Sequence, residues 1–135
     1  MKRALLCTGK IFYELAAYRE KRKREDIAII RLEQLYPFRT DLVEAALGQY
    51  RDGTPVFWAQ EEPENMGAWR YLNGRFGATR SGRMPLQLVS RPESASPATG
   101  SAGAHKLEQE QLVQRAFGED APAEPNKDEE SERGR

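Results

Sequence analysis

The sequence is poor in the residues that most often carry redox or metal chemistry, because its 135 residues include one cysteine, Cys7, and one histidine, His105. A single cysteine excludes an intramolecular disulfide and a zinc site made of several cysteines. A single histidine excludes a mechanism that needs two imidazoles from this chain. The low cysteine content fits a reducing compartment, so we expect a cytoplasmic location.

Long hydrophobic runs and an excess of one charge are also missing. The apolar run Ile27–Ile30 is far shorter than the roughly 20 residues that a membrane-spanning helix needs. The run Ala4–Cys7 is too short for the hydrophobic region of a signal peptide. Lysine and arginine together number 21, as do aspartate and glutamate, so the formal net charge is zero. We therefore expect neither a membrane span nor a nucleic-acid partner.

The zero net charge hides a difference between the body of the chain and its end. Residues 119–135 hold seven acidic and three basic residues, which leaves −4 in this segment and +4 in the remainder. The segment has two prolines and no apolar residue larger than alanine, so it buries too little surface to offset its ordering entropy. We therefore predict a folded domain, residues 1–118, and a disordered acidic tail, residues 119–135, that is dispensable for folding.

Strand-like and helix-like patterns alternate along the predicted domain, and the hydrophobic content of 39% is enough for one core. Short apolar runs predict strands at 3–7, 27–32, 56–59 and 85–90. Helical periodicity predicts helices at 10–23, 41–50, around 66–76 and from about 104. This alternation predicts an α/β fold: a three-layer sandwich with a mostly parallel sheet and helices on both faces.

The helical pattern also predicts which side chains face the sheet. In the second helix these are the pairs Leu42/Ala46 and Val43/Leu47. In the third they form the stripe Met66, Trp69, Leu72 and Phe76, which places Trp69 inside the domain. Ligands and partners of such sheets meet the carboxyl ends of the strands, so the loops at 8–10, 35–39, 60–67 and 91–100 are candidate sites.

Three sequence features suggest chemistry, and each has a simpler interpretation. Thr8-Gly9-Lys10 lies between a strand and a helix, where anions bind, but it lacks the remaining residues of a Walker loop and fits an ordinary tight turn. The basic cluster Arg19–Arg24 is interrupted by Glu20 and lacks aromatic partners, which favours a solvated helix end over a phosphate site. We interpret His105 as a capping or interface residue.

Glu61 and Glu62 follow the third predicted strand. Adjacent carboxylates in a dry cleft can act as an acid–base pair. However, successive residues of an extended chain point to opposite sides, so these two need not share a site. A structural or interface role is therefore favoured over catalysis, and Cys7, in a buried strand, is assigned no chemistry.

Four blocks of sequence resemble one family, and the resemblance extends from about Arg3 to Phe117. The blocks are 5–15 (LLCTGKIFYEL), 27–38 (IAIIRLEQLYPF), 60–69 (QEEPENMGAW) and 91–100 (RPESASPATG). They resemble the C-terminal domain of the thiamine-diphosphate-dependent first, decarboxylating component of the 2-oxoglutarate dehydrogenase complex. This family likeness implies a transketolase C-terminal-domain-like fold.

The resemblance also implies what lies outside this chain. The parent enzyme, of the citric acid cycle, decarboxylates 2-oxoglutarate and transfers the succinyl group to a lipoyl arm, and its preceding domains hold thiamine diphosphate and magnesium. No residue here matches the family's cofactor motif, so we assign no catalytic, cofactor-binding or metal-binding residue. The implied role is assembly with those domains, or with a split-gene partner, in a homo-oligomeric enzyme, through Glu61, Glu62 and Arg91.

A second interpretation comes from a different functional class. A domain without its cofactor-binding neighbours can also serve as a free-standing α/β module that binds a small anion or a protein through its strand-end loops. A neighbouring reading frame that encodes the cofactor-binding domains would distinguish the two.

Overall fold

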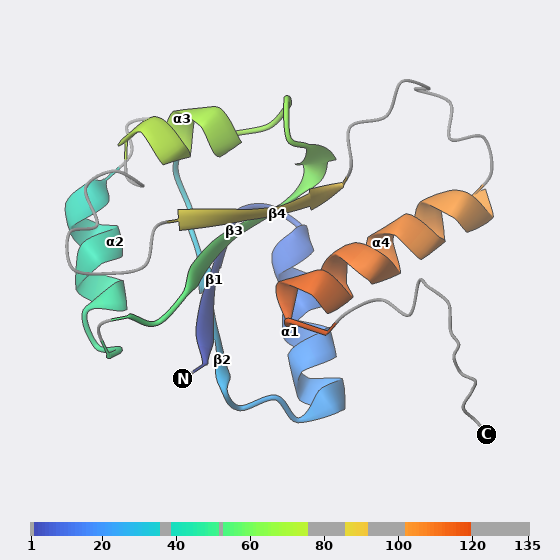
Figure 1. Cartoon of the computed structure of the whole chain (residues 1–135), viewed down its shortest axis with the longest axis horizontal. Helices are drawn as coiled ribbons and strands as arrows, with labels where there is room; N and C mark the ends of the chain where they lie inside the picture. Colours follow the sequence, from blue (N-terminus) through green and yellow to red (C-terminus); the bar gives the residue numbers. More distant parts are fainter. Residues whose placement is uncertain (1, 36–38, 52, 76–85, 92–101, 120–135) are drawn as a thin grey trace.

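The domain is an alternation of four strands and four helices across the residues that the structure describes (Figure 1). A computed structural model describes residues 2–35, 39–51, 53–75, 86–91 and 102–119. The strands are β1 (Arg3–Cys7), β2 (Ile27–Arg31), β3 (Val56–Pro63) and β4 (Leu86–Arg91). The helices are α1 (Ile11–Arg22), α2 (Thr40–Leu47), α3 (Trp69–Arg75) and α4 (Ala102–Ala116).

The four described strands form one sheet in the order β2-β1-β3-β4, and every pairing in it is parallel. The central strand β1 pairs through Leu5 with Ile29 of β2 on one side and with Phe57 of β3 on the other. Strands buried on both faces read as continuous apolar runs, which is why Arg3–Cys7 and Ile27–Arg31 lack strict alternation. The predicted parallel α/β sheet is confirmed.

The helices cover both faces of the sheet, which confirms the three-layer sandwich (Figure 1). On one face, α2 and α3 pack Val43, Leu47 and Leu72 against Leu6 and Trp58. The opposite face is covered by α1 and α4. There the buried cluster consists of Leu5, Cys7, Ile11, Leu15, Ile27, Ala59, Val89, Leu112, Val113, Ala116 and Phe117.

Two side chains that the periodicity assigned to the core are exposed. Leu42 is 58% exposed because α2 faces the sheet through Val43 and Leu47, and neighbouring helix positions diverge by about 100°. Met66 is 57% exposed because α3 begins only at Trp69, so Met66 lies in the preceding turn. Trp69 is half-buried against the core, as predicted, whereas Phe76 lies outside the described residues.

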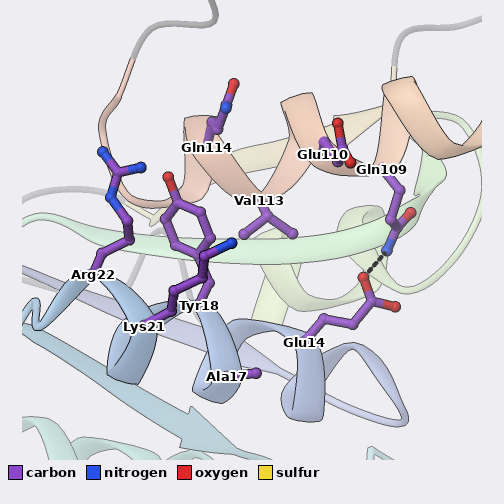
Figure 2. A pocket seen from close by; sticks show the side chains of 9 residues that line it. All are labelled: Glu14, Ala17, Tyr18, Lys21, Arg22, Gln109, Glu110, Val113 and Gln114. Atoms are coloured by element: carbon purple, nitrogen blue, oxygen red, sulfur yellow. Dashed lines mark hydrogen bonds between the residues drawn. The ribbon is translucent and has the colours of Figure 1, made fainter.

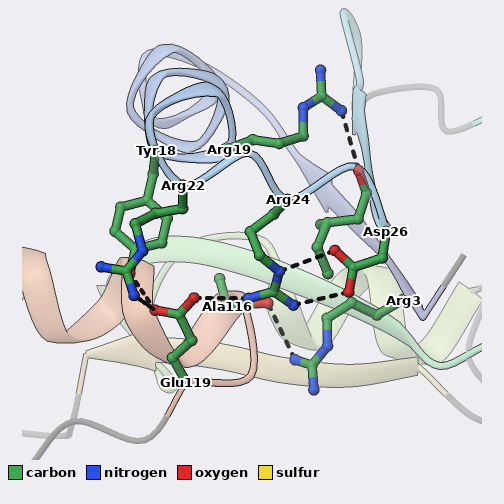
Figure 3. Close-up of polar contacts among 9 residues, drawn as sticks. Arg3, Tyr18, Arg19, Arg22, Arg24, Asp26, Ala116 and Glu119 are labelled. Atoms are coloured by element: carbon green, nitrogen blue, oxygen red, sulfur yellow. Dashed lines mark hydrogen bonds and ion pairs between the residues drawn. The ribbon is translucent and has the colours of Figure 1, made fainter.

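A polar network lies at the amino-terminal ends of the strands β1 and β2 (Figure 3). Arg3 donates to the carbonyl of Ala116 at 3.1 Å, at the end of α4, where helix carbonyls lack intrahelical partners. Arg24 binds Asp26 through two hydrogen bonds of 3.0 and 3.1 Å, and it also binds Glu119 at 2.7 Å. Glu119, which the sequence assigned to the tail, is therefore in contact with the domain.

The residue before Glu119 is a glycine, and its conformation favours that choice. Gly118 has φ of +78°, and a Cβ there would lie 2.7 Å from Nη2 of Arg3. Glycine tolerates this left-handed conformation after a helix without steric cost. It lets the chain turn from α4 toward Arg24.

No helix among the described residues is both long enough and apolar enough to cross a membrane.

The Arg24–Asp26 pair predicts a pH dependence of stability. The hydrogen bonds from Arg24 hold the pKa of Asp26 below its ordinary value. A depressed carboxyl pKa stabilises the fold above the unfolded-state pKa of about 4, and this stabilisation is lost as the pH falls. Asp26→Asn should therefore reduce the free energy of unfolding at neutral pH by about 0.5–1 kcal/mol, measured by urea denaturation.

The same substitution should matter less in acid. Between about pH 5 and pH 2 the stability difference between the wild type and Asp26→Asn should shrink toward zero. Glu25→Gln, a change at an exposed neighbour, is the control and should follow the wild type. A constant difference across this pH range would contradict the role of the Asp26 charge.

Candidate functional site

A crevice lies at the carboxyl ends of β1 and β3, where the order of the strands reverses. The chain passes from β1 to β2 on one side and returns to β3 on the other side. In open parallel sheets this reversal creates the crevice in which ligands and partners bind. Here it is a cavity of about 440 Å³. Its walls are Thr8–Ile11 after β1, Trp58–Glu62 of β3, and Leu35, Gly67 and Ala68.

Gln60 organises the wall that β3 contributes. Its side chain is buried, with 3% of the residue exposed. Its Oε1 accepts a hydrogen bond of 2.8 Å from the indole nitrogen of Trp58, which is itself buried. Its amide nitrogen donates to the carbonyls of Glu62, Pro63 and Met66 at 2.8–3.0 Å. One buried amide thus fixes the backbone that carries Glu61 and Glu62.

Two backbone features make room for this arrangement. The pairing of β3 with β4 shifts register between Ala59 and Pro63, and such irregularities re-aim side chains at strand ends. Gly67 has φ of +74°, and a Cβ there would lie 2.9 Å from Oε1 of Gln60. A larger residue at position 67 would therefore strain the backbone and disturb Gln60.

The structure brings both predicted carboxylates to the crevice but places them in different surroundings. Glu61 forms an ion pair with Lys10 at 3.5 Å, which joins β3 to the start of α1. The Lys10 side chain is 80% exposed, so this pair contributes little stability. Glu62 is exposed. In the described part of the chain, no three His, Cys, Asp or Glu residues form a group that could hold a metal ion.

Arg91, the third predicted interface residue, is opposite Pro63 in the sheet, next to Glu62, but its side chain joins a network with α4. Its guanidinium forms an ion pair with Glu108 at 2.8 Å, bonds to Gln109, and lies 3.4 Å from His105. Gln109 in turn donates to Glu14 of α1 at 2.9 Å (Figure 2). With 11% of its side chain exposed, Arg91 ties the end of β4 to two helices. Residues 92–100 of this predicted loop lie outside the described residues.

The three other candidate residues, Lys10, Cys7 and His105, lie in different environments. Lys10 is the exposed lysine of a tight turn, since Gly9 has φ of +79°. Cys7 is fully buried, and this burial raises the pKa of its thiol to about 11. A thiol with that pKa is protonated at neutral pH. His105 is exposed in the first turn of α4.

Sequence reasoning missed the central role of Gln60. A glutamine that directly follows a strand resembles any polar loop residue, and its burial depends on the indole two positions earlier. A tryptophan in a predicted buried strand was the available signal, because a buried indole nitrogen needs a hydrogen-bond acceptor nearby.

Comparison with known proteins identifies the family. A family model described as 2-oxoglutarate dehydrogenase C-terminal matches residues 1–117. The 2-oxoglutarate dehydrogenase E1 component of Cupriavidus necator is 40% identical over 117 residues, and that of Haemophilus influenzae is 42% identical over 117 residues. The mitochondrial 2-oxoglutarate dehydrogenase of Caenorhabditis elegans is 40% identical over 121 residues.

These alignments cover 87% of this chain but only 12% of each of the three relatives. The chain therefore spans about one eighth of the length of these relatives. The matched region contains all eight described strands and helices, together with the crevice built on Gln60. On this match, the chain belongs to the 2-oxoglutarate dehydrogenase C-terminal family.

Proposed function

We propose that this chain is the C-terminal assembly domain of a 2-oxoglutarate dehydrogenase first component. In that enzyme, the oxidative decarboxylation of 2-oxoglutarate and the succinyl transfer to a lipoyl group are carried out by other domains. The observation that carries the proposal is the family match over residues 1–117, combined with the 12% share of the relatives that it covers.

The cofactor of such an enzyme is proposed to bind outside this chain. The family likeness implies thiamine diphosphate and magnesium, and magnesium is held through oxygen ligands. No residue of this chain matches the family's cofactor motif, and the described part of the chain holds no group of three or more His, Cys, Asp or Glu residues that could bind a metal ion. We therefore assign the chain a role in binding neighbouring domains and derive no catalytic step from it.

The surface proposed for assembly is the crevice wall formed by Glu61 and Glu62. Gln60 holds this segment rigidly through three carbonyl groups, so little conformational entropy is lost when a partner binds it. Glu62 is exposed and carries a negative charge that can pair with a basic group of the preceding domains or of a second protomer. Arg91, engaged within the domain, acts by positioning the end of β4.

The first test concerns the cofactor. Titration of the full chain with thiamine diphosphate and magnesium in a calorimeter should give no saturable heat at micromolar cofactor. A complete E1 component from a relative serves as the positive control. Saturable binding to this chain would show that the cofactor-binding residues were assigned to the wrong domains.

The second test concerns assembly. The full chain is mixed with an E1 component of a relative that lacks its own C-terminal region, and complex formation is followed by sedimentation. Glu62→Lys should weaken the association at least about tenfold, because it places a like charge against a basic partner. Glu110→Lys, an equal charge reversal at an exposed position of α4, is the matched control and should leave association unchanged.

The variant Arg91→Ala separates a loss of folding stability from a loss of affinity for the partner. This change leaves Glu108 without its partner and should destabilise the domain by about 2 kcal/mol, while the crevice wall keeps its affinity in the fraction that is folded. Circular dichroism establishes that each variant is folded under the assay conditions. Equal association of the wild type, Glu61→Lys and Glu62→Lys would contradict the proposed surface.

A further inference from the structure

The amino-terminal edge of the sheet carries a cationic surface that the proposed assembly role does not use. We define it as the seven basic residues at this edge: Lys2, Arg3, Arg19, Lys21, Arg22, Lys23 and Arg24. The acidic residues among and beside them are Glu20, Glu25, Asp26 and Glu119. Seven positive and four negative charges give these residues a net charge of +3. Figure 3 shows Arg3, Arg19, Arg22 and Arg24 of this set together with Asp26 and Glu119.

The fold concentrates these charges at one place. Helix α1 ends at Arg22, and Lys23 takes a left-handed conformation with φ of +54°, so its N–H group caps the carbonyls of Arg19 and Glu20. Cations at this end complement the helix dipole. Positive groups also crowd one another here: besides burial, the charge of Arg24 contributes to lowering the pKa of Arg3.

The positive charges are only partly neutralised within the domain. Arg24 is paired with Asp26 and Glu119, and Arg19 donates to the carbonyl of Ile27 at 3.2 Å. Lys21 and Lys23 are exposed, and neither has an ion-pair partner in the part of the chain that the structure describes. Two lysines are therefore available to an acidic ligand.

The chain leaves the domain at this surface. Glu119 binds Arg24 at 2.7 Å and lies 3.6 Å from Arg22, and it accepts a hydrogen bond from the hydroxyl of Tyr18 (Figure 3). The family match ends at residue 117, so this anchor lies just beyond the part shared with the family. The first residue of segment 120–135 consequently follows a residue already bound to the cationic surface.

The segment matches the surface in charge and in reach. Residues 120–135 contain six acidic and three basic residues, a net charge of −3 against +3 on the surface. Sixteen residues span up to about 50 Å when extended. Lys21 and Lys23 flank Arg22, which lies 3.6 Å from the Glu119 carboxylate. A tethered ligand of this kind has an effective concentration of about millimolar, so weak charge pairing is enough to hold it.

We propose that segment 120–135 is an acidic intramolecular ligand that docks on the cationic surface and screens Lys21 and Lys23 from other anions. The contact is electrostatic, because the segment has no apolar residue larger than alanine to pack into a groove. It is therefore sensitive to salt and adds little to folding stability. Glu119 is its fixed point, and the acidic residues Glu124–Glu132 supply most of the charge.

The test uses the full chain labelled with nitrogen-15 and a variant in which five tail acids become amides. The changes are Glu124→Gln, Asp128→Asn, Glu129→Gln, Glu130→Gln and Glu132→Gln. At about 0.05 M salt, the amide shifts of Lys21, Arg22 and Lys23 should differ between the two proteins, and about 0.5 M salt should remove the difference. Amides around Lys10 and Lys106 should not respond.

A reciprocal pair of variants tests the surface itself. Lys21→Gln/Lys23→Gln should move the amide shifts of residues 120–135, whereas the matched control Lys10→Gln/Lys106→Gln should leave them in place. Unchanged α1 shifts in the amide variant, or equal effects of the two lysine pairs, would overturn the proposal. Differences that disappear on dilution would also overturn it, because they would assign the contact to the tail of a second copy.

Discussion

The hydrogen bond from the buried indole of Trp58 to Gln60 is the interaction on which the candidate site depends. A buried N–H group without an acceptor costs roughly 1–3 kcal/mol, so the strand needs a polar partner at its carboxyl end. Gln60 supplies the acceptor at 2.8 Å, and its own amide must then find acceptors in a buried position. The carbonyls of Glu62, Pro63 and Met66 meet that need, and the resulting fold of the loop favours glycine at position 67.

The two ends of the strands are held by different kinds of interaction. At the carboxyl edge, a buried amide fixes the backbone, and one carboxylate, that of Glu62, is left exposed to solvent. At the amino edge, guanidinium groups of Arg3 and Arg24 bind carbonyl and carboxylate oxygens from the end of α4 and from Glu119. The first edge lies within the family match, whereas the second includes a residue beyond it.

The sequence was sufficient to predict the order of the elements and the parallel sheet. Continuous apolar runs at Arg3–Cys7 and Ile27–Arg31 reflect burial on both faces, which few folds other than a parallel α/β sheet require. Helical periodicity was less reliable at the ends of elements. Leu42 and Met66 fit an apolar stripe by spacing alone, but the docking angle of α2 and the late start of α3 left both exposed.

Of the candidate site, the sequence by itself determined the residue types and their position at the strand ends, together with the family to which the chain belongs. Only the tertiary structure decided which groups these side chains contact. Glu61 meets Lys10 because β1 and β3 are neighbours in the sheet, and Arg91 turns to α4 because that helix packs beside β4. Glu119 joins the domain because Gly118 turns the chain toward Arg24. These contacts link residues far apart in sequence, and chain spacing carries no information about such distances until the elements are packed.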